Sequence, residues 1–436
     1  MKTTIALAGL VLAAFVSNVI ADEKLQPQRV LYVGHRADDF TPTLKRHFTK
    51  VETVARENFK PAQADDFDVV VLDWPQSHSN GRDSWDEGVP LGNRAEWRKP
   101  TVLLGSAGLN LAVAWKLKGG SGCTCLAPVA YGLKDHEIFK SPLPIDIRKT
   151  ATIPTVKQFA PELKTETMEV VPLIDGIKNY ARAVEDNSPG WATHYYEFAD
   201  MPDVELFSGG INSQTPRSSA LWRQGNLLHF GFEQSPKQLN DTGKAMLVNA
   251  VAYISRFTED RPIDITPSVF AKEAIGISRR RAKAYFTNPE YRPSWATNAL
   301  SASVLAAVNL ENRPAATEWY DANGQWLHPA TGNLLEVDQE ARARGTPFDS
   351  PDFLTKTISA LREKNDKAAV LLERYVADGP GKDADVSAWE KWWQENSKYV
   401  FYSELGGYKW YIDPLAKRRG IPTKDLRGPA RADVRK

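Results

Sequence analysis

Long apolar runs alternate with amphipathic stretches between about residues 29 and 257. RVLYVG (29–34), FDVVVLDW (67–74) and TVLLG (101–105) are continuous apolar runs, as expected for strands buried on both faces of a parallel sheet. Helices are predicted over TPTLKRHFTK (41–50), with Thr41 as N-cap and Pro42 at the first helical position, and over LNLAVAWKL (109–117). The alternation predicts a doubly wound, mostly parallel α/β sheet.

Later apolar runs add strands of a different kind. The Gly225-Asn226 pair between two of them is typical of a tight hairpin turn. DTGKAMLVNAVAYISRF (241–257) has the periodicity of an amphipathic helix that closes the region. The pattern therefore predicts antiparallel additions to the parallel sheet, with strands over residues 125–133, 168–174, 218–224 and 226–233.

The alternation ends at TEDRPIDITPS (258–268), which we take as a domain boundary. Beyond it the chain is richer in tryptophan and mainly helical in pattern, with helices expected at 267–289, 351–364, 366–376 and 386–400. The sequence predicts five parts: a signal peptide (1–21), an α/β domain (22–258), a linker helix (259–290), a smaller helical Trp-rich module (291–415) and a basic extended tail (416–436).

The first residues are typical of an export signal. Lys2 precedes the apolar run IALAGLVLAAFVSNVI, and small residues before Asp22 favour cleavage near Ala21. The alternative is an uncleaved N-terminal anchor. Because no later segment is long and apolar enough to cross a bilayer, we expect a periplasmic or extracellular protein without a membrane span.

Composition narrows the function classes. The 436-residue chain is 42% hydrophobic and 25% charged, with a formal net charge of +1, so nothing favours a nucleic-acid partner. Its two cysteines, Cys123 and Cys125, are too few for a disulfide framework. A Cys-x-Cys bridge would be strained, so two buried thiols are favoured over a bridge, although export is compatible with one.

Several stretches together resemble the class I glutamine amidotransferase-like superfamily, and within it the ThuA-like (trehalose-utilisation-like) branch. They are RVLYVGHRADD, FDVVVLDW, the GSAG turn at 105–108, YGLKDHEIFKSP and GNLLHFGFEQSP. The resemblance covers about half the chain and implies a flavodoxin-like fold. It does not imply amidotransferase activity, because the family's Gly-x-Cys-x-Gly elbow has no cysteine here.

The elbow can be aligned with that motif in two ways. One puts Ala107 at the nucleophile position, and the other puts Ser106 there. His229 and Glu233 are four residues apart and would lie about 13 Å apart on one strand, too far for a base and its orienting carboxylate. Ser106 and His229 are therefore catalytic candidates only, and a turn packed by small residues is the favoured interpretation.

Polar residues follow each of the predicted parallel strands, where open α/β sheets bind ligands. The candidate ligand-binding residues are His35, Asp38, Asp73, Ser106 and His136. The alternative assigns the aspartates to helix caps and strand ends and the histidines to solvated loops. His35, Asp38, Asp39 and His78 have donor atoms for a metal, but their spacing follows no ligand motif. We expect no metal and no cofactor.

The C-terminal half resembles a module that recurs on exported proteins of planctomycete-type bacteria, on the stretches 316–345 and 388–423. Trp389, Trp392 and Trp393 share one helical face. They form either a sugar-stacking platform or, as we favour, a buried stripe. The basic residues at 279–281 and in the tail (Lys417, Arg418, Arg419, Lys424, Arg427 and Arg431) are expected to be solvated rather than bound to an anionic surface.

Three functions remain open from the sequence. The first is an exported ThuA-like protein that binds a small polar ligand, such as a sugar derivative. The second is a non-catalytic structural or interaction protein with a partner in the cell envelope. The third is a hydrolase that uses Ser106.

Overall fold

The computed structural model describes residues 25–74, 89–115, 117, 122–177, 179–180, 189–194, 201–265, 279, 282–283, 286, 299–330, 334–363 and 366–423. The predicted signal peptide, His78, most of the predicted linker helix, and Lys424, Arg427 and Arg431 lie outside these residues.

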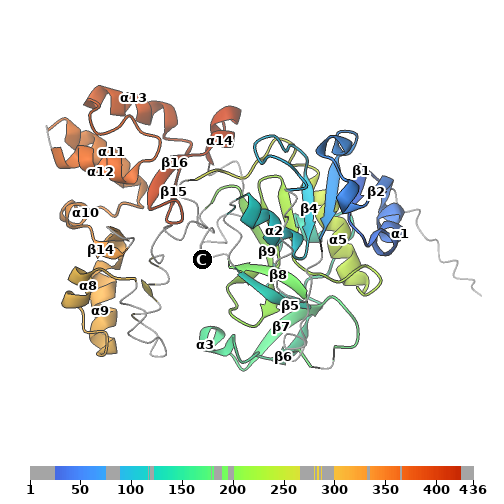
Figure 1. The fold of residues 1–436 in the computed structure, drawn as a ribbon. Helices are drawn as coiled ribbons and strands as arrows, with labels where there is room; N and C mark the ends of the chain where they lie inside the picture. The colour runs from blue at the N-terminus through green and yellow to red at the C-terminus, as the bar shows by residue number, and fades with distance from the viewer. Residues whose placement is uncertain are drawn as a thin grey trace, which may run out of the picture.

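The N-terminal region is built on one 12-stranded sheet (Figure 1). Its parallel part has the order β12-β4-β3-β1-β2, and the register aligns Val30 with Val69, Val70 with Thr101, and Thr101 with Leu227. The α/β class is confirmed. The parallel strands are β1 (Gln26–Val33), β2 (Phe48–Val54), β3 (Val69–Asp73), β4 (Thr101–Leu104) and β12 (Leu227–Phe230).

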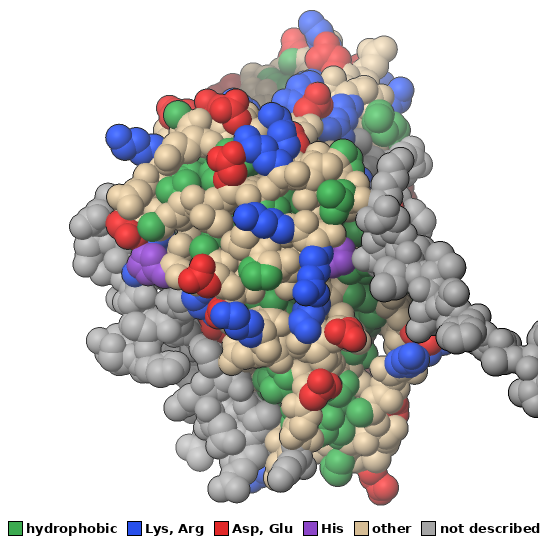
Figure 2. Space-filling model, turned by 90° about the vertical axis from the view of Figure 1, so that its right-hand side faces the viewer, with side chains coloured by type: hydrophobic (Ala, Val, Ile, Leu, Met, Phe, Trp, Pro, Cys, Tyr) green, Lys and Arg blue, Asp and Glu red, His purple; other side chains and the backbone are tan. Residues whose placement is uncertain are grey.

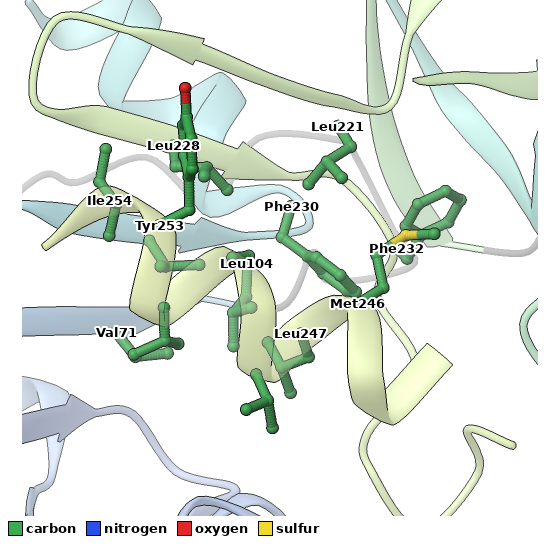
Figure 3. Close-up of a cluster of buried hydrophobic side chains, with 14 of the residues drawn as sticks. Val71, Leu104, Leu221, Leu228, Phe230, Phe232, Met246, Leu247, Tyr253 and Ile254 are labelled. Carbon is green, nitrogen blue, oxygen red and sulfur yellow. The ribbon is translucent and has the colours of Figure 1, made fainter. Parts of the chain in front are cut away.

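Helices cover both faces of this parallel part. On β4, Val102 and Leu104 pack in the cluster that contains α5 (Asp241–Ile254), whereas Leu103 packs in the cluster that contains α2 (Ala107–Ala114). Helix α1 (Ala37–His47) lies on the α5 face. Figure 3 shows the α5 side, where apolar side chains of the helix point at the strands. This two-sided burial explains why β3, β4 and the second half of β1 are continuous apolar runs.

The remaining strands extend the sheet in antiparallel fashion. The predicted hairpin at Gly225 is present, and it joins β11 antiparallel to β12. Beyond β11 the order continues through β9, β5, β8 and β10, with β7 and β6 beside β5, so the antiparallel part is larger than predicted. These strands are β5 (Gly122–Tyr131), β6 (Ala151–Pro154), β7 (Thr167–Pro172), β8 (Pro189–His194), β9 (Val204–Asn212), β10 (Ser218–Ser219) and β11 (Leu221–Gln224), and the short helix α3 (Ala160–Leu163) lies between β6 and β7.

Three predicted boundaries differ from the structure. Helix α1 begins four residues before Thr41, with Asp38 and Asp39 in its first turn, where the helix dipole favours acidic groups. Residues 48–50 of the predicted helix belong to β2, which was not predicted. The predicted extended tail starts inside helix α14 (Pro414–Arg419), whose first turn is capped by Asp413.

The C-terminal region is mainly helical and has an apolar core of its own (Figure 1). Its centre includes Trp389, Tyr375 and Phe348, and Arg279 lies over the ring of Phe348 while pairing with Glu404 and Asp349. Because Arg279 is 7% exposed, the expectation that it is solvated is wrong. The elements are α8 (Ala302–Ala307), α9 (Arg313–Asn323), β13 (Leu327–Pro329), β14 (Leu335–Val337), α10 (Gln339–Ala343), α11 (Pro351–Leu361), α12 (Asp366–Tyr375), α13 (Val386–Asn396), β15 (Val400–Ser403), β16 (Lys409–Ile412) and α14.

An apolar cluster joins the two regions. Trp222 of β11 and Ile263 pack with Phe401 and Tyr411 of the β15–β16 hairpin. Because these side chains are buried, the hairpin forms a packed junction rather than a loose tether.

Two further features concern the charge of the surface and the length and polarity of the helices. Figure 2 shows acidic and basic side chains interspersed on the face that carries α1 and β2, in keeping with the balanced charge. No helix among the described residues is long and apolar enough to span a bilayer.

Cys125 is disulfide-bonded, so the prediction of two buried thiols is wrong.

Candidate functional site

The turn between β4 and α2 has its left-handed residue at Gly105, with φ of +51°. At a nucleophile elbow the reactive side chain belongs to the residue in the strained conformation, and here that residue has no side chain. A Cβ at Gly105 would lie 1.7 Å from Oε2 of Glu233. Both alignments considered above therefore miss the strained position, which belongs to neither Ser106 nor Ala107.

Ser106 lies directly after this glycine and is 1% exposed. Its Oγ donates a hydrogen bond to the carbonyl of Trp74 at 2.6 Å, and its backbone N–H donates to Oε2 of Glu233 at 3.0 Å. Within the part of the chain that the structure describes, no base accepts the Ser106 proton. The geometry gives this serine a structural role in joining the ends of β3 and β4.

A buried network lies beside Ser106, and we call Tyr32, Arg36, Asp73 and Glu233 the strand-end cluster. Arg36 forms a two-pronged ion pair with Asp73, at 2.9 Å from Nε and 2.5 Å from Nη2. Its Nη1 donates to the carbonyl of Glu233 at 2.7 Å, and the Tyr32 hydroxyl donates to Asp73. The network gathers residues from β1, β3, the start of α1 and the segment after β12 at the carboxyl ends of the parallel strands.

Burial controls the protonation of this cluster. Burial raises the pKa of Glu233 to about 8, although Arg36 and the Ser106 N–H oppose the shift. Burial also disfavours the charged form of Arg36, but the hydrogen bond and the negative charge of Asp73 outweigh this effect. The pKa of Arg36 is therefore raised. The cluster thus holds the Arg36–Asp73 ion pair beside a carboxyl group, Glu233, whose burial favours its uncharged form and whose Oε1 lies 3.5 Å from Nη2 of Arg36.

His229 lies apart from that network. Its ring stacks on Trp222, with ring centroids 3.8 Å apart, and a Cβ at Gly108 would lie 2.5 Å from its Nδ1. Neither ring nitrogen has a hydrogen-bond partner among the described residues, and burial lowers the pKa of His229 to about 3. The structure therefore does not form a Ser106–His229 pair.

The other predicted ligand-binding residues are dispersed. His35 is exposed and pairs with Glu57 at 2.6 Å, and Asp38 lies in the first turn of α1. The ring of His136 packs against Phe207, with centroids 4.9 Å apart. Of the predicted set, only Asp73 and Ser106 lie at the strand-end cluster.

Sequence reasoning missed Tyr32, Arg36 and Glu233 as members of this cluster. Arg36 closely follows a buried parallel strand, and Asp73 ends the neighbouring one. An arginine and an aspartate at adjacent strand ends would have been the signal for a buried pair. In the described ranges, no group of three or more His, Cys, Asp or Glu side chains is placed to hold a metal ion.

The tryptophan stripe of α13 belongs to the core. Trp389 is 0% exposed, and Trp392 donates from Nε1 to the carbonyl of Asp378 at 2.7 Å. Since Trp389 has no accessible ring face, the stripe cannot serve as a three-ring sugar platform.

Comparison with known proteins adds little. No family model and no curated protein matches the chain. Similar solved structures include a GMP synthase-type protein from Thermoplasma acidophilum, with 10% identity over 54% of this chain and 98% of that chain and a TM-score of 0.31. Another is a ThuA-like protein from Bacteroides uniformis ATCC 8492, with 11% identity over 52% of this chain and 90% of that chain and a TM-score of 0.28. The assignments to the ThuA-like branch and to a planctomycete-type module stay predictions.

Proposed function

We propose that this chain is an exported α/β protein of the ThuA-like kind that binds a small, uncharged polar ligand, such as a sugar derivative, at the carboxyl ends of its parallel strands. We further propose that it has no glutamine amidotransferase activity. The observation that carries the ligand class is the burial of Glu233, which is 4% exposed and whose pKa burial raises to about 8.

The charge balance of the strand-end cluster favours a neutral ligand. The Arg36 cation is matched by the Asp73 carboxylate at 2.9 and 2.5 Å, so a charged ligand would bring an unpaired charge to a buried site. A protonated carboxyl group can donate as well as accept hydrogen bonds. Hydroxyl groups of a sugar or polyol suit such a group.

The elbow supports the absence of glutamine hydrolysis. The residue in the strained conformation is Gly105, and the Ser106 hydroxyl donates to a backbone carbonyl. A glutaminase assay should therefore give no ammonia above background.

A calorimetric titration tests the ligand class. We expect one or more of glucose, trehalose and myo-inositol to bind wild-type protein. Glu233→Gln, which keeps an uncharged hydrogen-bonding group, should bind within about threefold of wild type, whereas Glu233→Leu should bind at least about tenfold more weakly. Glu57→Gln, at an exposed carboxylate, is the matched control. The proposal fails if none of these compounds binds the wild-type protein.

One observation favours a second function, a non-catalytic interaction protein of the cell envelope. Arg36 and Asp73 bond to each other, and Ser106 bonds to Glu233 and to the carbonyl of Trp74, which also suits a purely structural network. Co-sedimentation with purified peptidoglycan, together with no sugar binding in the titration, would support this alternative.

A further inference from the structure

A cavity lies where the end of the α/β region meets helix α14. Its volume is about 430 Å³, and its lining residues are Thr258, Glu259, Arg261, Arg418 and Arg419. In Figure 1, α14 is the helix of the C-terminal region drawn beside the α/β region. The cavity is separate from the strand-end cluster, with which it shares no residue.

Positive charge dominates this lining. The lining includes three arginines and one glutamate, and Glu259 is already engaged by Arg419 at 3.5 Å. Arg419 also contacts the buried Asp260 at 3.3 Å. By contrast, neither Arg261 nor Arg418 forms a carboxylate ion pair among the described residues. Arg418 donates to the backbone carbonyl of Glu259 at 2.9 Å, and Nη1 of Arg261 donates to the backbone carbonyls of Thr258, at 2.9 Å, and Asp260.

The guanidinium groups also repel one another. Burial lowers the pKa of Arg261, and the nearby charges of Arg98 and Arg418 add to this effect, more than Asp260 and Glu259 offset it. Gathering like charges costs free energy, which a bound anion would recover.

The backbone holds Arg261 in place. A Cβ at Gly225 would lie 2.3 Å from the backbone of Arg261 and Pro262, so the hairpin turn and this segment are in close contact. Ile263 N–H donates to the Asp203 carboxylate at 2.7 Å on the other side of Pro262. A charged side chain on such a fixed segment is pre-organised for a ligand.

We propose that this cavity binds a tetrahedral oxyanion, a phosphate or sulfate group, between Arg261 and Arg418. The planar guanidinium fork matches the oxygen geometry of such groups, and the lining has two positive charges in excess of its one carboxylate. Because one arginine comes from each region of the chain, a bound anion links the α/β region to α14 and stabilises their junction.

The test is a thermal-shift and calorimetric titration of the full chain with inorganic phosphate, sulfate and glucose 6-phosphate, with sodium chloride holding the ionic strength constant. We expect binding to wild type together with a raised unfolding temperature. Arg261→Gln and Arg418→Gln should each weaken binding at least about tenfold, because a hydrogen bond to a charged group is lost. Arg418→Lys should fall between these and wild type.

Controls separate a site from a general salt effect. Arg148→Gln removes an arginine that pairs with Asp146 at the surface and should bind like wild type. Circular dichroism of each variant without ligand checks folding, and the exposed Arg418 position keeps the test valid if Arg261→Gln does not fold. Tighter binding of glucose 6-phosphate than of phosphate, lost in Arg418→Gln, would identify a phosphorylated small molecule as the ligand of this cavity, and equal binding would identify the free ion. No binding to wild type, or unchanged binding in both arginine variants, would overturn the proposal.

Discussion

The backbone N–H of Ser106 donates a hydrogen bond of 3.0 Å to the Glu233 carboxyl group. This contact joins the elbow after β4 to the segment after β12, and it occupies the space that a side chain at Gly105 would need. The elbow is therefore filled by a carboxyl group from a neighbouring strand end rather than by a nucleophile.

The raised pKa of Glu233 makes stability depend on pH. An ordinary glutamate titrates near 4.5, and burial raises this value to about 8 in the folded chain. Between these values the folded chain holds a proton that the unfolded chain releases, so the free energy of unfolding falls as pH rises, by at most about 1.4 kcal/mol per unit. Glu233→Gln cannot ionise. Between pH 5.5 and 8.5, the free energy of unfolding of Glu233→Gln, measured with urea, should rise by at least about 1.4 kcal/mol relative to that of wild type. If the two proteins show the same change in unfolding free energy with pH, this prediction is contradicted.

Gly105→Ala should destabilise the fold strongly. The substitution adds left-handed backbone strain of about 1–2 kcal/mol and a clash with Glu233. Gly132→Ala is the matched control, because Gly132 has φ of +59° and nothing within 4 Å of its added Cβ. We expect chemical unfolding to show a loss for Gly105→Ala at least about 1 kcal/mol larger than for the control. Equal losses of stability in the two variants would mean that the Glu233 side chain moves away from the added methyl group without loss of folding free energy.

His229 should make the fold sensitive to acid. Burial lowers its pKa from 6.5 to about 3, so between these values the unfolded chain binds a proton that the folded chain does not, and stability falls as pH falls. His229→Leu should be within about 1 kcal/mol of wild type at pH 7.5 and more stable than wild type at pH 4.5, as measured by urea unfolding. The exposed His35→Gln variant should show no such crossover. A wild type as acid-resistant as His229→Leu would count against this burial effect.

Trp389→Ala should unfold the C-terminal region more readily. The side chain is 0% exposed, and truncating a buried tryptophan costs about 3–5 kcal/mol. Trp393→Ala, on the same helix but only partly buried, is the comparison and should cost clearly less. Thermal unfolding of the two variants compares their losses of stability. A larger loss for Trp393→Ala than for Trp389→Ala would contradict the burial of Trp389 and support an accessible aromatic face.

The parts of the fold that depend on local pattern were predictable from sequence. The buried runs containing Val70 and Val102, the hairpin at Gly225 and the helix from Asp241 follow from hydrophobic period and turn chemistry. Strand β2 was not predictable, because its sequence FTKVETV follows directly on an amphipathic helix without a turn signal. Strand order and the size of the antiparallel part depend on long-range pairing, which no local pattern encodes.

The site was predictable only in part. The strand-end rule placed Asp73 and Ser106 at one edge of the sheet, and in the structure both lie there beside Glu233 and Arg36; their binding of a ligand stays a prediction. It could not distinguish His35, which pairs with Glu57 at the surface, from Arg36, which turns inward to Asp73. The backbone conformation of each residue after a strand decides whether its side chain faces solvent or a neighbouring strand end, and the adjacent residues His35 and Arg36 differ in this respect.

The pairing of β12 with β4, which aligns Leu227 with Thr101, also has a consequence for folding order. These two strands are separated by most of the α/β region, and contacts between distant segments form slowly because a long loop must close first. The elbow and its carboxyl neighbour can assemble only after β12 has been synthesised. A chain leaving the ribosome would therefore remain without a completed sheet until most of the α/β region has been synthesised.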